Sequence, residues 1–236
     1  MNKHNPLRDW QVERSLIRTV GRDLQRPECI LAEPDGTLWS ADARGGVMRI
    51  NPDGTQLLVA QKIDGRFGAS NAADKFILRG TLPNGLAFAV NGDILIANFG
   101  TDAIERMTRT GESRTLFTEI DGRPLGKVNF ILRDSKHRIW VTVHTRRDPW
   151  TLCVRDKTPD GYIALLDERG IRVVADGFVG TNEIRMDGGG APGQIRNDPC
   201  ILKGSAAQRQ QLCLRIGLCK EQHDGDVLGE WLVVHS

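Results

Sequence analysis

The sequence predicts an all-β fold of the propeller class, and three observations lead to this prediction. Three segments align without a gap, each holds two short apolar runs joined by a turn, and each carries a polar residue in one fixed place. The segments are PECILAEPDGTLWSAD from Pro27, PNGLAFAVNGDILIAN from Pro83 and VNFILRDSKHRIWVTV from Val128. A repeat of about fifty residues filled with short strands is typical of one four-stranded propeller blade.

The strands of each copy follow from the alternation of apolar residues and from the turns between them. The Asp-Gly and Asn-Gly pairs at 35–36 and 91–92 favour tight hairpins in the first two copies. In the first copy the expected strands are 29–33, 37–41, 47–51 and 56–60. In the third copy the later strands are RIWVTVHTR, GYIALLDE and GIRVVADGF. No helical pattern of useful length competes with these strands, except in the C-terminal tail.

The repeated polar position favours a propeller over a sandwich. It holds Glu28, Asn84, Asn129 and, in a fourth copy that starts TNEIRMD, Asn182. The successive spacings are 56, 45 and 53 residues. In a propeller the starts of the innermost strands surround one channel, so these four side chains would line a single polar pocket. The alternative is that asparagine recurs only because it suits a turn or a strand entry.

A carboxylate and several amide oxygens that face one another are hard donors, which suit Ca²⁺, Mg²⁺ or Mn²⁺. Zinc is a further option, although it usually recruits His or Cys. An ion of this kind polarises a carbonyl and activates water, so the residues predict metal-assisted hydrolysis of an ester or lactone. No Ser-His-Asp arrangement or nucleophile elbow is visible.

Composition excludes several other classes of function. The chain has 236 residues, 39% hydrophobic and 26% charged, with a formal net charge of +2. The small net charge and scattered basic residues argue against nucleic acid and membrane surfaces as partners. No apolar run has the length of a signal peptide core or a membrane span. Five cysteines without a Cys-x-x-Cys pair favour a reducing cytoplasm.

Four phrases carry a resemblance to a known family: RPECILAEPDGTLWSAD, LPNGLAFAVNGDILIANFG, GKVNFILRDSKHRIWVTV and GYIALLDERGIRVVADGFVGTNEIRMD. In this order they resemble the senescence marker protein/gluconolactonase family, the regucalcin-like lactonases, over roughly residues 20 to 187. The resemblance implies a six-bladed propeller with one divalent metal in its channel, bound by a Glu, an Asn and an Asp. It also implies a small-molecule lactone as substrate, and a gluconolactonase-like enzyme.

By similarity, Glu28 and Asn182 match the Glu and Asn metal ligands. Asn129 matches a substrate-contacting Asn, although Phe130 stands where the family typically has Asp, and Asn84 is expected to line the pocket. The third ligand, which is also the family's general base, is expected to be Asp224 in HDGDVLGEWLVVHS.

The chain divides into propeller blades over 1–187 and a divergent tail over 188–236, which has lost the strand–turn rhythm. Three and a half to four blades make an incomplete six-bladed propeller, so truncation or a frameshift after residue 187 is the hypothesis. Open blade edges then predict self-association. Loss of a ligand predicts a weak or inactive lactonase. The alternatives are a non-catalytic fragment that binds a small molecule or metal, and a scaffold that uses its faces for protein contacts.

The places of three other residues in the repeat predict their structural roles. Trp39 and Trp140 occupy equivalent positions and are expected to pack between blades. His144 follows a strand and is expected to be a polar strand-end residue, with a pocket-facing side chain as the alternative.

Overall fold

The computed structural model describes residues 11, 13–62, 80–187 and 198–201. These residues form three four-stranded antiparallel sheets, each a meander in chain order. The first sheet holds β1 (Ile30–Ala32), β2 (Leu38–Asp42), β3 (Gly46–Ile50) and β4 (Gln56–Ala60). The second holds β5 (Pro83–Phe88), β6 (Ile94–Asn98), β7 (Ala103–Met107) and β8 (Ser113–Phe117). The third holds β11 (Val128–Arg133), β12 (Ile139–Val143), β13 (Gly161–Asp167) and β14 (Gly170–Phe178).

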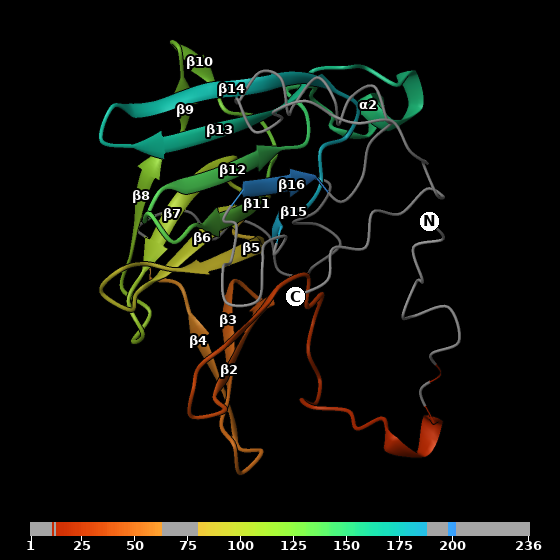
Figure 1. Ribbon diagram of the computed structural model, residues 1–236, viewed down its shortest axis with the longest axis vertical. Coiled ribbons are helices and arrows are strands. Elements are labelled where there is room, and N and C mark those ends of the chain that lie inside the picture. Colours follow the sequence, from red (N-terminus) through yellow and green to blue (C-terminus); the bar gives the residue numbers. More distant parts are fainter. Residues whose placement is uncertain (1–10, 12, 63–79, 188–197, 202–236) are drawn as a thin grey trace, which may run out of the picture.

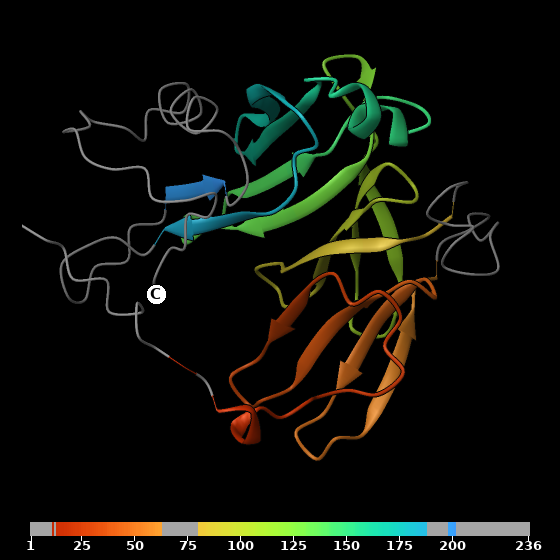
Figure 2. The same ribbon diagram turned by 90° about the vertical axis from the view of Figure 1, so that its right-hand side faces the viewer.

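The three sheets follow one another in an arc, from the orange sheet through the yellow to the teal one (Figures 1 and 2). A further antiparallel pair, β15 (Ile184–Asp187) with β16 (Asp198–Ile201), lies next to β11 and β12. The first strands of neighbouring sheets lie against each other, β1 on β5 and β5 on β11. The architecture is therefore a partial β-propeller, and the predicted all-β class is confirmed.

The first hairpin of every blade has the same register. Ile30 pairs with Ser40, Leu86 with Ile96, and Ile131 with Val141. These pairs are related by the repeat spacings of 56 and 45 residues, so the sequence alignment is also a structural alignment.

The hairpin turns need a left-handed residue at one fixed position. Gly36 and Gly92 take it with φ of 89° and 84°, and neither glycine pays a steric cost there. The third blade has His137 at the equivalent place, with φ of 63°. The turn that lacks an Asp-Gly or Asn-Gly pair therefore has the same shape as the other two.

The predicted packing role of Trp39 and Trp140 is confirmed, because both belong to the main hydrophobic core and are 1% and 3% exposed. Each indole nitrogen donates to a carboxylate at the equivalent position before the turn, Trp39 to Glu33 and Trp140 to Asp134. A buried tryptophan keeps its N–H satisfied in this way. The repeat thus specifies the polar partner as well as the apolar body.

Some elements were not anticipated from the sequence. A short helix, α2 (Thr151–Asp156), lies between β12 and β13, and a hairpin of β9 (Glu119–Ile120) and β10 (Arg123–Pro124) precedes β11. The single turn η1 (Arg14–Leu16) precedes the first blade. In the described part of the chain no helix has the length and apolarity that crossing a bilayer requires.

Candidate functional site

Two of the predicted site residues occupy β-bulges at the starts of innermost strands. The pairing of β5 with β6 passes from Pro83↔Asn98 directly to Gly85↔Ala97, which leaves Asn84 without a ladder partner. In β11 the same irregularity falls at Asn129, between Val128 and Phe130. A bulge inserts one unpaired residue and redirects its side chain. The two asparagines are therefore released from the sheets at the same place in consecutive blades.

The structure brings Asn84 and Asn129 together. The side-chain Nδ2 of Asn84 donates to the backbone carbonyl of Asn129 at 2.8 Å. Both residues are buried, at 3% and 7% exposure. The Oδ1 atoms of both side chains are buried and have no hydrogen-bond partner among the described residues. Because buried acceptors are normally satisfied, two such oxygens at one end of adjacent strands indicate a place for a cation or a donor group.

Gly85 allows the two strands to approach closely. A Cβ atom at this position would lie 2.6 Å from the Cα of Phe130 and 2.7 Å from the nitrogen of Ile131. Both are backbone atoms of β11, so a side chain would force the blades apart. The glycine after Asn84 therefore sets the separation of the two asparagine segments.

The hydroxyl group of Thr142 links Asn182 to the segment that contains Asn129. The Oγ1 of Thr142 donates to the carbonyl of Asn182 and accepts from the backbone N–H of Phe130 at 3.1 Å. A single side chain thus joins the segment that follows Asn129 to the segment that precedes β15. Asn182 itself is partly buried.

Glu28 is placed differently. It precedes β1, its side chain is 42% exposed, and its carboxylate lies 3.3 Å from the guanidinium of Arg26. No hydrogen bond joins Glu28 to Asn84, Asn129 or Asn182 within the described residues. The structure therefore brings Asn84, Asn129 and Asn182 into one connected region. The fourth repeated residue, Glu28, is paired instead with the guanidinium of Arg26. Burial lowers the pKa of Arg26, and the neighbouring Glu28 carboxylate acts in the opposite direction.

One of the three predicted metal ligands cannot be placed relative to this region. Asp224, the predicted third ligand and general base, lies outside the described residues. Within the described ranges, no three His, Cys, Asp or Glu side chains gather in a group that could hold a metal ion. The donors that do fit a hard cation are the orphaned amide oxygens of Asn84 and Asn129.

An aromatic cluster lies at the same end of the blades. Phe99 and His144 follow β6 and β12 at equivalent repeat positions, and their ring centroids are 6.2 Å apart with an edge-on orientation. Trp150, just before α2, packs edge-on against both rings, at 5.5 Å from Phe99 and 5.7 Å from His144. The cluster and the asparagine pair lie at the same end of the blades, because β6 and β12 end where β5 and β11 begin.

His144 follows β12, as the sequence predicts, and its half-buried ring packs against Phe99 and Trp150. Its Nδ1 lies 3.2 Å from the carbonyl of Thr181. Its Nε2 is buried, with no hydrogen-bond partner in the part of the chain that the structure describes. Burial lowers the pKa of His144, while the Thr181 carbonyl and the Asp160 carboxylate act in the opposite direction. The sequence signal that was missed is the shared column of Phe99 and His144.

Positive charge borders the cluster. The ammonium of Lys127 donates to the carbonyl of Phe99 at 3.2 Å, pairs with Asp102 at 2.8 Å, and lies 5.5 Å from the centre of the Phe99 ring. The guanidinium of Arg26 lies 5.8 Å from the centre of the same ring. Each of these cations has a carboxylate partner, Asp102 for Lys127 and Glu28 for Arg26, so two ion pairs lie at the edge of the cluster.

A second polar cluster is closed and structural. Glu105 is fully buried and accepts hydrogen bonds from Gln61, Asn98 and Thr101 at 2.7 to 2.8 Å. Asn98 also donates to Thr81 at 2.8 Å. Since the carboxylate already has several donors, this network holds β6 to β7 and to the segments that precede β5.

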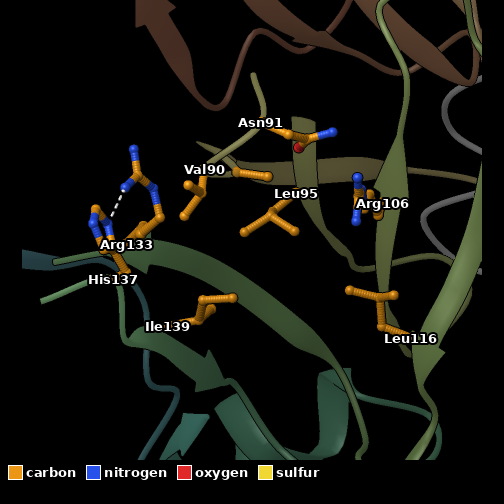
Figure 3. A pocket seen from close by; sticks show the side chains of 9 residues that line it. Val90, Asn91, Leu95, Arg106, Leu116, Arg133, His137 and Ile139 are labelled. Atoms are coloured by element: carbon orange, nitrogen blue, oxygen red, sulfur yellow. Dashed lines mark hydrogen bonds between the residues drawn. The ribbon is translucent and has the colours of Figure 1, made fainter. Parts of the chain in front are cut away.

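An apolar cavity lies at the opposite end of the hairpins. It has a volume of about 370 Å³, lies between the second and third blades, and is shown in Figure 3. Apolar side chains line its floor, and Arg106, Arg133 and His137 stand at its edge. The nitrogens of Arg133 and His137 are hydrogen-bonded to each other at 2.8 Å. This cavity is separate from the asparagine region, since it is built at the turns and not at the strand starts.

No protein-family model matches the chain, and no curated protein matches it by sequence. Solved structures with similar blades include a catalytically inactive virginiamycin B lyase from Staphylococcus aureus with quinupristin, at 19% identity and a TM-score of 0.42. That match covers 66% of this chain and 42% of the lyase. A gluconolactonase from Xanthomonas campestris matches at 19% identity and 0.43, over 60% and 44% of the two chains. A protein of unknown function from Bacteroides thetaiotaomicron matches at 13% and 0.47, over 66% and 40%.

This chain therefore spans less than half the length of each of these three structures. At such identities the likeness concerns the arrangement of blades, and no activity follows from it. The chain is similar in part to propellers that include a gluconolactonase and a streptogramin-class lyase, and it is itself a partial propeller with an amide-lined strand end.

Proposed function

We propose that the asparagine-lined end of the inner strands binds a small lactone or a related ester and supports its hydrolysis with the help of one divalent cation. The observation that carries the proposal is the pair of buried, unpartnered amide oxygens of Asn84 and Asn129. Two acceptors of this kind favour a ligand or an ion between the first strands of neighbouring blades. The family resemblance of the sequence supplies the substrate class.

The residues would divide the work by their positions. Asn84 and Asn129 orient the ligand through their Oδ1 atoms, since both side chains are held by the bulges. Glu28, Asn182 and Asp224 are the proposed ligands of the cation, which would be Ca²⁺, or otherwise Mg²⁺, Mn²⁺ or Zn²⁺. When bound, such an ion polarises the lactone carbonyl.

One feature favours a second candidate, a binding module without catalysis. The Glu28 carboxylate already lies beside Arg26, and it would have to leave this partner to approach an ion. A ligand with hydrogen-bond donors would instead satisfy the asparagine oxygens directly. In that case the ligand binds with the same affinity whether divalent ions are present or removed.

The deciding experiment is lactone hydrolysis by folded, soluble protein with Ca²⁺, Mg²⁺, Mn²⁺ or Zn²⁺, and after treatment with a chelator. Metal-dependent turnover that Glu28→Ala abolishes supports the proposal. Glu112→Ala is the matched control, since Glu112 is also an exposed carboxylate paired with a basic side chain, Lys62 at 2.8 Å. Turnover that is absent from the wild type, or equal in Glu28→Ala and the control, contradicts it.

A further inference from the structure

The imidazole of His144 lies where two segments of the proposed site meet. The backbone N–H of His144 donates to the carbonyl of Lys127 at 2.8 Å, and Lys127 lies two residues before Asn129. Its ring Nδ1 lies 3.2 Å from the carbonyl of Thr181, the residue before Asn182. One residue is therefore fixed to the entrances of both β11 and β15.

The hydrogen bond of Nδ1 determines the tautomer. A backbone carbonyl only accepts, so Nδ1 carries the hydrogen, and Nε2 of the neutral ring holds a free lone pair. This Nε2 is buried and has no partner within the described residues. A buried acceptor without a donor costs stability, which makes a bound water or substrate hydroxyl its natural partner.

The surroundings hold the ring in place and disfavour its charged form. Phe99 and Trp150 pack edge-on against it, and a Cβ atom at Gly180 would lie 3.0 Å from its Cε1. Three kinds of charge face this cluster: the ammonium of Lys127, paired with Asp102; the guanidinium of Arg26 across Phe99; and the carboxylate of Asp160. Burial has the largest effect among these influences and lowers the pKa of His144.

We infer that His144 is the general base of this site, with Nε2 taking a proton from the water that attacks the substrate carbonyl. This inference rests on the proposed function. The water oxygen forms a bond to the carbonyl carbon while its proton passes to Nε2. The ring C–O bond of the lactone then breaks, and the leaving alkoxide takes the proton back from Nε2. The balance is lactone plus water to hydroxy acid, with no other reactant.

This assignment differs from the sequence prediction, which gave the same role to Asp224. Within the described structure Nδ1 of His144 is anchored by the Thr181 carbonyl and Nε2 has no hydrogen-bond partner, so Nε2 is the atom that can accept a proton. Asp224 keeps its proposed role as a metal ligand. If His144 is the base, His144→Gln loses the acidic limb of the pH profile; if Asp224 is the base, His144→Gln keeps it.

The first test compares His144→Gln with His137→Gln in a lactone hydrolysis assay over pH 5 to 9. His137 is the matched control because it is exposed and lies at the opposite end of the hairpins. Wild type and His137→Gln should lose kcat/KM as the pH falls through the lowered pKa of His144, because the base becomes protonated. His144→Gln should lose about 10²- to 10⁴-fold in kcat and should lack this acidic limb.

The second test removes the ring and returns its chemistry. In His144→Ala, imidazole should restore turnover, whereas pyrrole, a ring of the same size without a basic lone pair, should not. Equal effects of the two compounds, or an unchanged pH profile in His144→Gln, would overturn the inference while leaving the proposed function intact. Absence of turnover in the wild type would overturn both. Circular dichroism establishes that each variant is folded.

Discussion

The side chain of Asn84 donates a hydrogen bond to the backbone carbonyl of Asn129, its counterpart one blade later, at 2.8 Å. Equivalent residues of a repeat are therefore in direct contact, and the contact crosses from β5 to β11. The same bond leaves the Oδ1 atom of Asn84 free to face a ligand. One side chain thus serves both the packing of blades and the proposed site.

Replacement of Asn84 by alanine should destabilise the protein by about 1–3 kcal/mol, because a buried carbonyl loses its donor. The free energy of unfolding in urea measures this loss. Asn91→Ala is the comparison, since Asn91 lies exposed in the turn of the same hairpin and accepts only a bond of 3.3 Å from the backbone of Asp93; its loss should be the smaller of the two. Equal losses in the two variants would show that the cross-blade bond contributes nothing.

Replacement of Gly85 by alanine should destabilise the protein more than Gly54→Ala. The new Cβ would lie 2.6 Å from the backbone of Phe130, whereas nothing lies within 4 Å of a Cβ at Gly54. Gly54 has φ of 83°, so its substitution costs only local strain of about 1–2 kcal/mol. Thermal denaturation of both variants compares the two costs. A smaller loss for Gly85→Ala would mean that the blades separate without penalty.

Removal of the Glu105 carboxylate should have a large effect on stability. Glu105→Ala removes the acceptor of two buried donors, Gln61 and Asn98, and of the partly buried Thr101 hydroxyl; a buried group left unsatisfied costs about 1–3 kcal/mol. The exposed pair of Glu112 with Lys62 should contribute at most about 1 kcal/mol by the same measurement. Urea denaturation of Glu105→Ala and Glu112→Ala tests the contrast, which fails if the two midpoints agree.

Asp134 should make stability depend on pH in acid. Burial raises the pKa of this carboxyl, but hydrogen bonds from Trp140 and Arg138 outweigh burial, and the pKa lies below its ordinary value. A folded-state pKa below that of the unfolded chain, about 3.9, stabilises the protein above that pH. This contribution is lost as the pH falls through the folded-state value.

Asp134→Asn should therefore be less stable than the wild type at pH 7, and the difference should shrink below about pH 4. Urea midpoints of both proteins at pH 7, 5, 4 and 3 give the comparison. A difference that stays constant over this range would show that ionisation of Asp134 is not the source of the stabilisation.

Much of the blade architecture could be predicted from the sequence, because the repeat carries both the strands and their polar partners. The expected strand at 56–60 matches β4, and the expected 170–178 matches β14. Equivalent tryptophans have equivalent carboxylate partners. These features depend on contacts within one blade, and short-range patterns of turn and alternation determine such contacts.

Features that depend on contacts between blades could not be predicted in the same way. The bulges at Asn84 and Asn129 need the register of the neighbouring strand, which no local pattern records. The burial of His144 depends on Phe99 from the previous blade and on Trp150 from a loop. The ion pair that holds Glu28 depends on Arg26, whose place follows from the path of the chain before β1.

The bulges have a consequence for how such a protein changes over time. A residue without a ladder partner can be exchanged while the strand pairs on either side of it keep their register. This column of the repeat already holds one glutamate, Glu28, and three asparagines. In the second and third blades, a substitution at the bulge would change the chemistry of the strand start while the pairing within the hairpin is kept. New specificities could arise there by single substitutions, with the hairpins left as they are.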